Sequence, residues 1–119
     1  MSVILNTDIL ESLEELMGDN FQELLVMFYR DSKRYADNIL QGFEEGDAQI
    51  VVDGAHSLKA SAANIGMELL ASHSGRIENA ALVIVNEGQG QLADINAEIK
   101  ELQQIYERSI EALRATVKA

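Results

Sequence analysis

The chain has 119 residues, a length typical of one domain with one hydrophobic core, so we treat residues 1–119 as a single domain. Its formal net charge of −11 disfavours binding to nucleic acid or to an anionic membrane, because both are negatively charged. The absence of cysteine excludes disulfides, thiolate nucleophiles and cysteine-ligated zinc. No apolar run approaches the roughly 20 residues that span a bilayer. The chain start lacks the pattern of a signal peptide, so we expect a cytoplasmic protein.

The composition predicts an all-α protein, because proline is absent and strand-like runs are few. After an extended lead-in over residues 1–6, the segment Asp8–Glu11 reads as a capping box. It predicts a short helix over residues 9–17 that ends at Gly18.

A second helix, capped by Asp19 or Asn20, is expected to continue to Gly46. Its apolar side chains recur at helical spacing over about six turns. The predicted inward stripe consists of Phe21, Leu24, Leu25, Phe28, Ser32, Tyr35, Ile39 and Phe43.

The third helix is predicted to begin after the cap Asp47 and to end at Gly66 in a left-handed conformation. At about 100° per residue, one narrow stripe faces the core, and His56 lies about 140° away from it, toward solvent. Lys59 shares the face of His56, because it is three residues further along the helix. The inward stripe consists of Val51, Ala55, Leu58, Ala62 and Ile65.

A fourth helix is expected over residues 67–87, and the clearest break in the chain, Gly88–Gly90, separates it from a last helix. The last helix places apolar residues at alternating three- and four-residue steps from Leu92 to Val117, which suits packing at about 20°. Four long helices with short connections predict an antiparallel up-down-up-down four-helix bundle, with the short first helix capping one end.

Three glycines, Gly42, Gly54 and Gly75, fall inside predicted helices, where each costs about 1 kcal/mol relative to alanine. Gly54 lies two residues before His56, and we expect it to allow a close approach between helices. The sequence offers no reason for Gly75.

The only two imidazoles belong to His56 and His73. We expect His73 to be partly buried and hydrogen-bonded, because it lies near the inward stripe of its helix. We predict no metal site, because no carboxylate stands at ligand spacing from the two histidines. From residue 54 to residue 67 the only charged side chain is Lys59, and such a surface suits the approach of another protein.

The order of His56, Lys59 three residues later and Gly66 ten residues later, with small residues between them, resembles histidine phosphotransfer (HPt) domains. The segment Glu23–Leu25, followed by Phe28, is also similar to the family's second helix. The resemblance covers about residues 9–81 and implies a four-helix bundle that presents an exposed histidine. One departure is that Ala60 replaces the glycine that usually follows the lysine in the family.

The resemblance implies a protein that relays a phosphoryl group between aspartates of receiver domains, with His56 as the phosphoacceptor. It implies that Glu78, twenty-two residues after His56, accepts a hydrogen bond from the imidazole Nδ1. It further implies that Lys59 offsets charge on the phosphoryl oxygens. The expected docking residues are Ser57, Ala60, Ala63 and Asn64.

The implied partners are response-regulator receiver domains and a hybrid sensor kinase, and we expect a monomer. No cofactor is expected in this chain, because Mg²⁺ belongs to the acidic pocket of the partner receiver. The chain carries no ATP-binding motif, so we do not expect it to phosphorylate itself. One alternative is a non-catalytic helical adaptor that binds a partner through the patch around Ala60 and Asn64. A third possibility is a metal-binding bundle.

Overall fold

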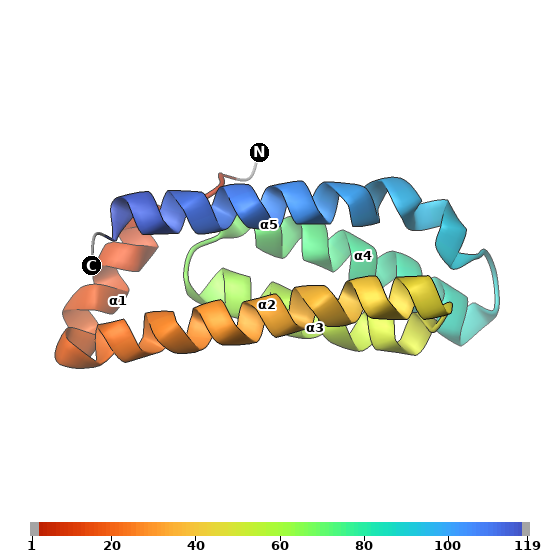
Figure 1. Cartoon of the computed structure of the whole chain (residues 1–119), viewed down its shortest axis with the longest axis horizontal. Coiled ribbons are helices and arrows are strands. Elements are labelled where there is room, and N and C mark those ends of the chain that lie inside the picture. Colours follow the sequence, from red (N-terminus) through yellow and green to blue (C-terminus); the bar gives the residue numbers. More distant parts are fainter. Residues whose placement is uncertain (1–2, 118–119) are drawn as a thin grey trace.

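The computed structural model describes residues 3–117, and within this range every regular element is a helix. The elements are α1 (Thr7–Met17), η1 (Gly18–Asn20), α2 (Phe21–Glu45), α3 (Ala48–Asn64), α4 (Glu68–Glu87), η2 (Leu92–Ile95) and α5 (Asn96–Thr116). The four long helices α2 to α5 run alternately in opposite directions, and α1 lies across one end of the bundle (Figure 1). The predicted up-down-up-down bundle with a short additional helix is therefore confirmed.

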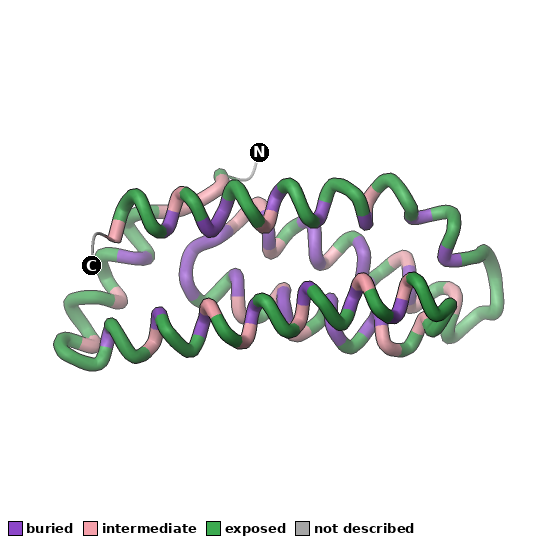
Figure 2. Tube along the Cα trace, in the orientation of Figure 1, coloured by how far each residue is buried: buried purple, intermediate pink, exposed green. Residues whose placement is uncertain are grey.

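Helix α3 packs against α2 and α4, and α5 packs against α4 and α2, so α3 and α5 are diagonal to each other. The buried side of each helix faces the interior (Figure 2). The predicted stripes supply the core, because Ile39, Leu58, Leu70, Leu102 and Leu113 are all buried. Each such side chain contributes about 1.5–3 kcal/mol by leaving water.

The start of α1 differs from the prediction. The cap is Asn6, whose side-chain oxygen accepts from the backbone N–H groups of Asp8 and Ile9. The predicted capping box is therefore wrong, and Asp8 is an exposed residue of the first turn. Asn6 has an extended backbone, and its own N–H donates to the Gly66 carbonyl, so the chain enters the helix at Thr7.

The last helix also begins differently, because a 3-10 turn, η2, precedes α5. Gln91 and Asp94 form a capping box around this turn, in which each side chain accepts from the backbone N–H of the other. The α-helical bonds of α5 begin only at Asn96. Asp47 caps α3 as predicted and accepts from Ile50 N–H at 3.1 Å.

Gly54 sets how closely α2 and α3 approach. A Cβ at this position would lie 2.9 Å from Ile39 Cγ1 and 3.2 Å from the Tyr35 carbonyl oxygen, both in α2. The expected close approach is therefore confirmed. This close contact fixes the position of α3 against α2 at a point two residues before His56.

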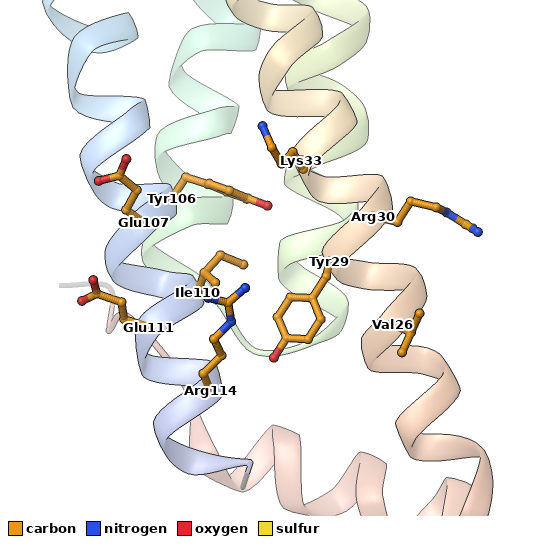
Figure 3. Close-up of a pocket in the computed structure, with 9 residues that line it drawn as sticks. All are labelled: Val26, Tyr29, Arg30, Lys33, Tyr106, Glu107, Ile110, Glu111 and Arg114. Atoms are coloured by element: carbon orange, nitrogen blue, oxygen red, sulfur yellow. The ribbon is translucent and has the colours of Figure 1, made fainter. Parts of the chain in front are cut away.

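A groove of about 670 Å³ opens between α2 and α5 (Figure 3). Arg114 lies with its guanidinium carbon 5.5 Å from the centre of the Tyr29 ring, and the hydroxyls of Ser32 and Tyr106 are hydrogen-bonded at 2.9 Å between the two helices. The α2–α5 side is opposite the α3–α4 side of the bundle, so the groove is remote from His56. Its lining consists of Val26, Tyr29, Arg30, Lys33, Tyr106, Glu107, Ile110, Glu111 and Arg114.

Across residues 3–117, no helix has both the length and the apolar character that crossing a bilayer requires.

Candidate functional site

His56 projects from the outer face of α3, and its side chain is 64% exposed. The opposite face of the same helix is buried at Val51, Ala55, Leu58 and Ala62. Burial of that stripe fixes the rotation of α3 and thereby directs the imidazole outward.

Glu78 lies beside His56 although it belongs to α4. Its Oε2 is 2.7 Å from Nδ1 of the imidazole, and its side chain is only 10% exposed. Helices α3 and α4 form a hairpin that turns at Gly66, so a residue twelve positions after the turn returns to the level of His56. A carboxylate can only accept, so Nδ1–H is the donor, which assigns the lone pair to Nε2.

Lys59 contacts the same carboxylate. Its Nζ lies 2.7 Å from Glu78 Oε1, so one buried carboxylate binds both the imidazole and the ammonium. The sequence did not indicate this ion pair. The pair also explains Gly75, because a Cβ there would lie 3.3 Å from Lys59 Cδ. The aliphatic stem of Lys59 thus lies against α4 at a position that has no side chain.

The two contacts change the acidity of Glu78. Burial by itself raises the pKa of this carboxyl. Hydrogen bonds from Lys59 and His56, with the attraction of their positive charges, outweigh burial, so the pKa is lowered from its ordinary value of 4.5. Glu78 is therefore ionised at neutral pH, accepts a hydrogen bond from His56 and forms an ion pair with Lys59.

We expect Glu78→Gln to lower the free energy of unfolding by about 1–2 kcal/mol at pH 7, because a charge-assisted contact is lost. Since folding lowers the pKa of Glu78, its stabilising contribution is complete above about pH 4.5 and disappears as the pH falls through the folded-state value. The difference between wild type and variant should therefore shrink as the pH falls below 4.5. Urea unfolding of wild type and Glu78→Gln at about pH 7, 4 and 3 measures this difference in the free energy of unfolding.

Glu101→Gln is the matched control, because Glu101 is an exposed carboxylate on α5. Its effect on stability should stay within about 0.5 kcal/mol at each pH. If the difference in free energy of unfolding between wild type and Glu78→Gln did not change with pH, ionisation of Glu78 would not be the source of its stabilising effect.

The expected docking residues lie on the exposed side of α3. Ala60, Ala63 and Asn64 are exposed, and Ser57 is half-buried. They follow His56 toward the end of the bundle at which α1 lies (Figure 1). These four residues lie on the face of α3 that the sequence predicted, and their role in docking stays a prediction.

The structure adds a neighbouring apolar surface that the sequence did not indicate. Two shallow pockets both include Asn64, one between α2 and α3 and the other formed with α1. We define the α1–α3 surface as the exposed apolar side chains and pocket residues around Asn64. The exposed or half-buried members are Ile9, Leu13, Leu16, Leu24, Met27 and Ser61, and the buried Phe28 and Ile65 also line the pockets.

His73, by contrast, is inaccessible. It is 2% exposed, its Nε2–H donates to the Glu98 carbonyl oxygen at 2.7 Å, and Arg76 donates to its Nδ1 at 3.0 Å. The predicted buried, hydrogen-bonded histidine is therefore confirmed. No group of three or more metal-ligating side chains was found among residues 3–117.

Comparisons with known proteins assign the fold to a family. The Hpt domain family model matches residues 23–116. The structure is similar to the crystal structure of histidine-containing phosphotransfer protein B (HptB) from Pseudomonas aeruginosa PAO1, with a TM-score of 0.77 and 26% identity, covering 92% of this chain and 90% of that chain. A comparison with curated proteins found no match.

The chain belongs to the Hpt domain family. It is a histidine phosphotransfer protein of a phosphorelay. The family implies receiver domains and kinases as its partners.

Proposed function

We propose that His56 is the residue that carries the phosphoryl group, on Nε2. The observation that supports this most directly is the 2.7 Å contact between its Nδ1 and Glu78 on an imidazole whose side chain is 64% exposed. The contact orients the ring and leaves the nucleophilic lone pair on the other nitrogen. His73 lacks this property, because both of its ring nitrogens are hydrogen-bonded inside the protein.

In the transfer step, the Nε2 lone pair attacks the phosphorus of an aspartyl phosphate on a receiver domain. The bond from phosphorus to the aspartate oxygen breaks, the N–P bond forms, and the aspartate leaves as a carboxylate. The Nδ1 proton stays on the ring, where Glu78 offsets the positive charge. The reverse reaction with a second receiver completes the relay. Positioning and charge stabilisation account for most of such catalysis.

We propose that Lys59 is the cation that reaches the phosphoryl oxygens, because it lies one turn from His56 on the same face and is 41% exposed although its ammonium is paired with Glu78. Mg²⁺ is proposed to belong to the receiver's acidic pocket, with no cofactor in this chain. We propose a hybrid sensor kinase and receiver domains as the partners of a cytoplasmic monomer. Family membership favours this relay over the adaptor alternative.

The proposal is tested with the wild-type chain, a phosphorylated receiver domain and Mg²⁺. The chain should acquire a phosphoryl group that is stable in base and labile in acid, and peptide mapping should locate it on His56. Modification of His73, or of a serine or carboxylate, would reject the assignment.

We propose that receivers dock on Ser57, Ala60, Ala63 and Asn64 and on the adjoining α1–α3 surface. Ala60→Arg should then lower kcat/KM for transfer from a phosphorylated receiver by about tenfold. Tenfold corresponds to about 1.4 kcal/mol, a loss that substitutions near the centre of an interface commonly cause. The reason is that a long side chain one turn after His56 obstructs close approach. Stopped-flow or quench-flow kinetics measures the change.

Ala97→Arg, on the exposed side of α5, is the matched control and should leave kcat/KM within about twofold. Equal losses in the two variants would argue against docking at Ala60, because they would reflect added charge alone.

A further inference from the structure

Glu78 divides its two oxygens between the two functional side chains of α3. Oε2 is 2.7 Å from His56 Nδ1, and Oε1 is 2.7 Å from Lys59 Nζ. In an imidazole, Nδ1 and Nε2 lie on different sides of the ring. The ammonium is therefore held at the carboxylate on the Nδ1 side, whereas the phosphoryl group is expected on the Nε2 side.

The structure favours this location of the ammonium in two ways. The Glu78 side chain is 10% exposed, so its negative charge is poorly screened by water and attracts the ammonium strongly. The stem of Lys59 follows the gap left by Gly75, where an added Cβ would lie 3.3 Å from Cδ. The Lys59 side chain is nevertheless 41% exposed, so a second anion can reach the ammonium.

We propose that Glu78 sequesters Lys59 from the phosphoryl group and thereby shifts the phosphoryl-exchange equilibrium away from phosphorylated His56. A phosphoryl dianion on Nε2 must compete with Glu78 for the ammonium, so part of the attraction is spent in weakening an existing ion pair. Glu78 then has two roles: it orients the imidazole, and it limits the stability of the phosphohistidine. A less stable phosphohistidine donates more readily to the next receiver. This inference rests on the proposed role of His56 as the phosphoacceptor.

The opposite hypothesis is that Glu78 presents Lys59 to the phosphoryl group. A double-mutant cycle distinguishes sequestration from presentation by the sign of the coupling between Glu78 and Lys59. Glu78→Gln retains an oxygen that accepts from Nδ1–H and removes the charge that binds Lys59. The measured quantity is the equilibrium constant for phosphoryl exchange with one receiver domain. It is obtained for wild type, Glu78→Gln, Lys59→Ala and the double variant.

Sequestration predicts that Lys59→Ala lowers this equilibrium constant more in the Glu78→Gln background than in the wild type. The expected ratio of the two effects is about threefold to tenfold, which lies in the lower part of the range found for coupling between residues in contact. Equal effects in the two backgrounds, or a smaller effect in the Glu78→Gln background, would overturn the proposal.

Two controls separate this result from other causes. Glu101→Gln removes one carboxylate from α5, and it should leave the effect of Lys59→Ala unchanged if general charge is not responsible. Peptide mapping of each phosphorylated variant shows whether His56 carries the group. Label on another residue would reject the proposed function itself, whereas label on His56 with the wrong sign of coupling would reject sequestration alone.

Discussion

Replacing His56 with glutamine is expected to abolish phosphoryl transfer to the chain and to leave the helical bundle intact. Glutamine has no ring nitrogen that can attack the aspartyl phosphate. The side chain of His56 is 64% exposed and lies outside the core, so we expect the free energy of unfolding to change by no more than about 0.5 kcal/mol. Label transfer from a phosphorylated receiver and circular dichroism on the same sample measure the two properties.

His73 is not expected to replace the missing imidazole. It is 2% exposed, and the Glu98 carbonyl and the Arg76 guanidinium occupy its two ring nitrogens. Acid-labile label that persists in His56→Gln would therefore contradict both the assignment and the reason for excluding His73. Loss of label together with loss of helicity would contradict the claim that His56 is dispensable for folding.

Replacing Gly66 with alanine is expected to lower the free energy of unfolding by about 2–4 kcal/mol. Gly66 has φ of +85°, which disfavours any residue with a Cβ. The added Cβ would also lie 2.8 Å from the Asn6 carbonyl oxygen and 3.3 Å from Ile9 Cβ. Backbone atoms cannot rotate away, so the lead-in to α1 must move, and the 2.7 Å hydrogen bond from Asn6 N–H to the Gly66 carbonyl is weakened.

Gly88→Ala is the control for the backbone conformation alone. Gly88 has φ of +65°, but a Cβ added there would have no neighbouring side chain or distant backbone atom within 4 Å. Its replacement should cost about 1–2 kcal/mol, the usual penalty for a left-handed residue. Urea unfolding of both variants gives the difference, and equal losses would show that the contact with Asn6 does not contribute.

The sequence by itself determined the helices and the faces that they bury. An α-helix repeats every 3.6 residues, so the direction of a side chain relative to the inward stripe follows from local spacing. The outward direction of His56 and the buried direction of His73 could both be predicted in this way. The ends of α2 and α3 followed from Gly46 and Gly66, which both have positive φ.

The tertiary structure alone decided where the ammonium of Lys59 lies. Whether Lys59 extends into solvent or toward Glu78 on α4 depends on the distance and rotation between two helices, and neither is encoded in the local spacing of α3. Gly75 and Glu78 leave the room and supply the charge that draws the ammonium to α4. The α1–α3 surface and the cap at Asn6 likewise depend on where the first helix lies, which is set by contacts with the distant turn at Gly66.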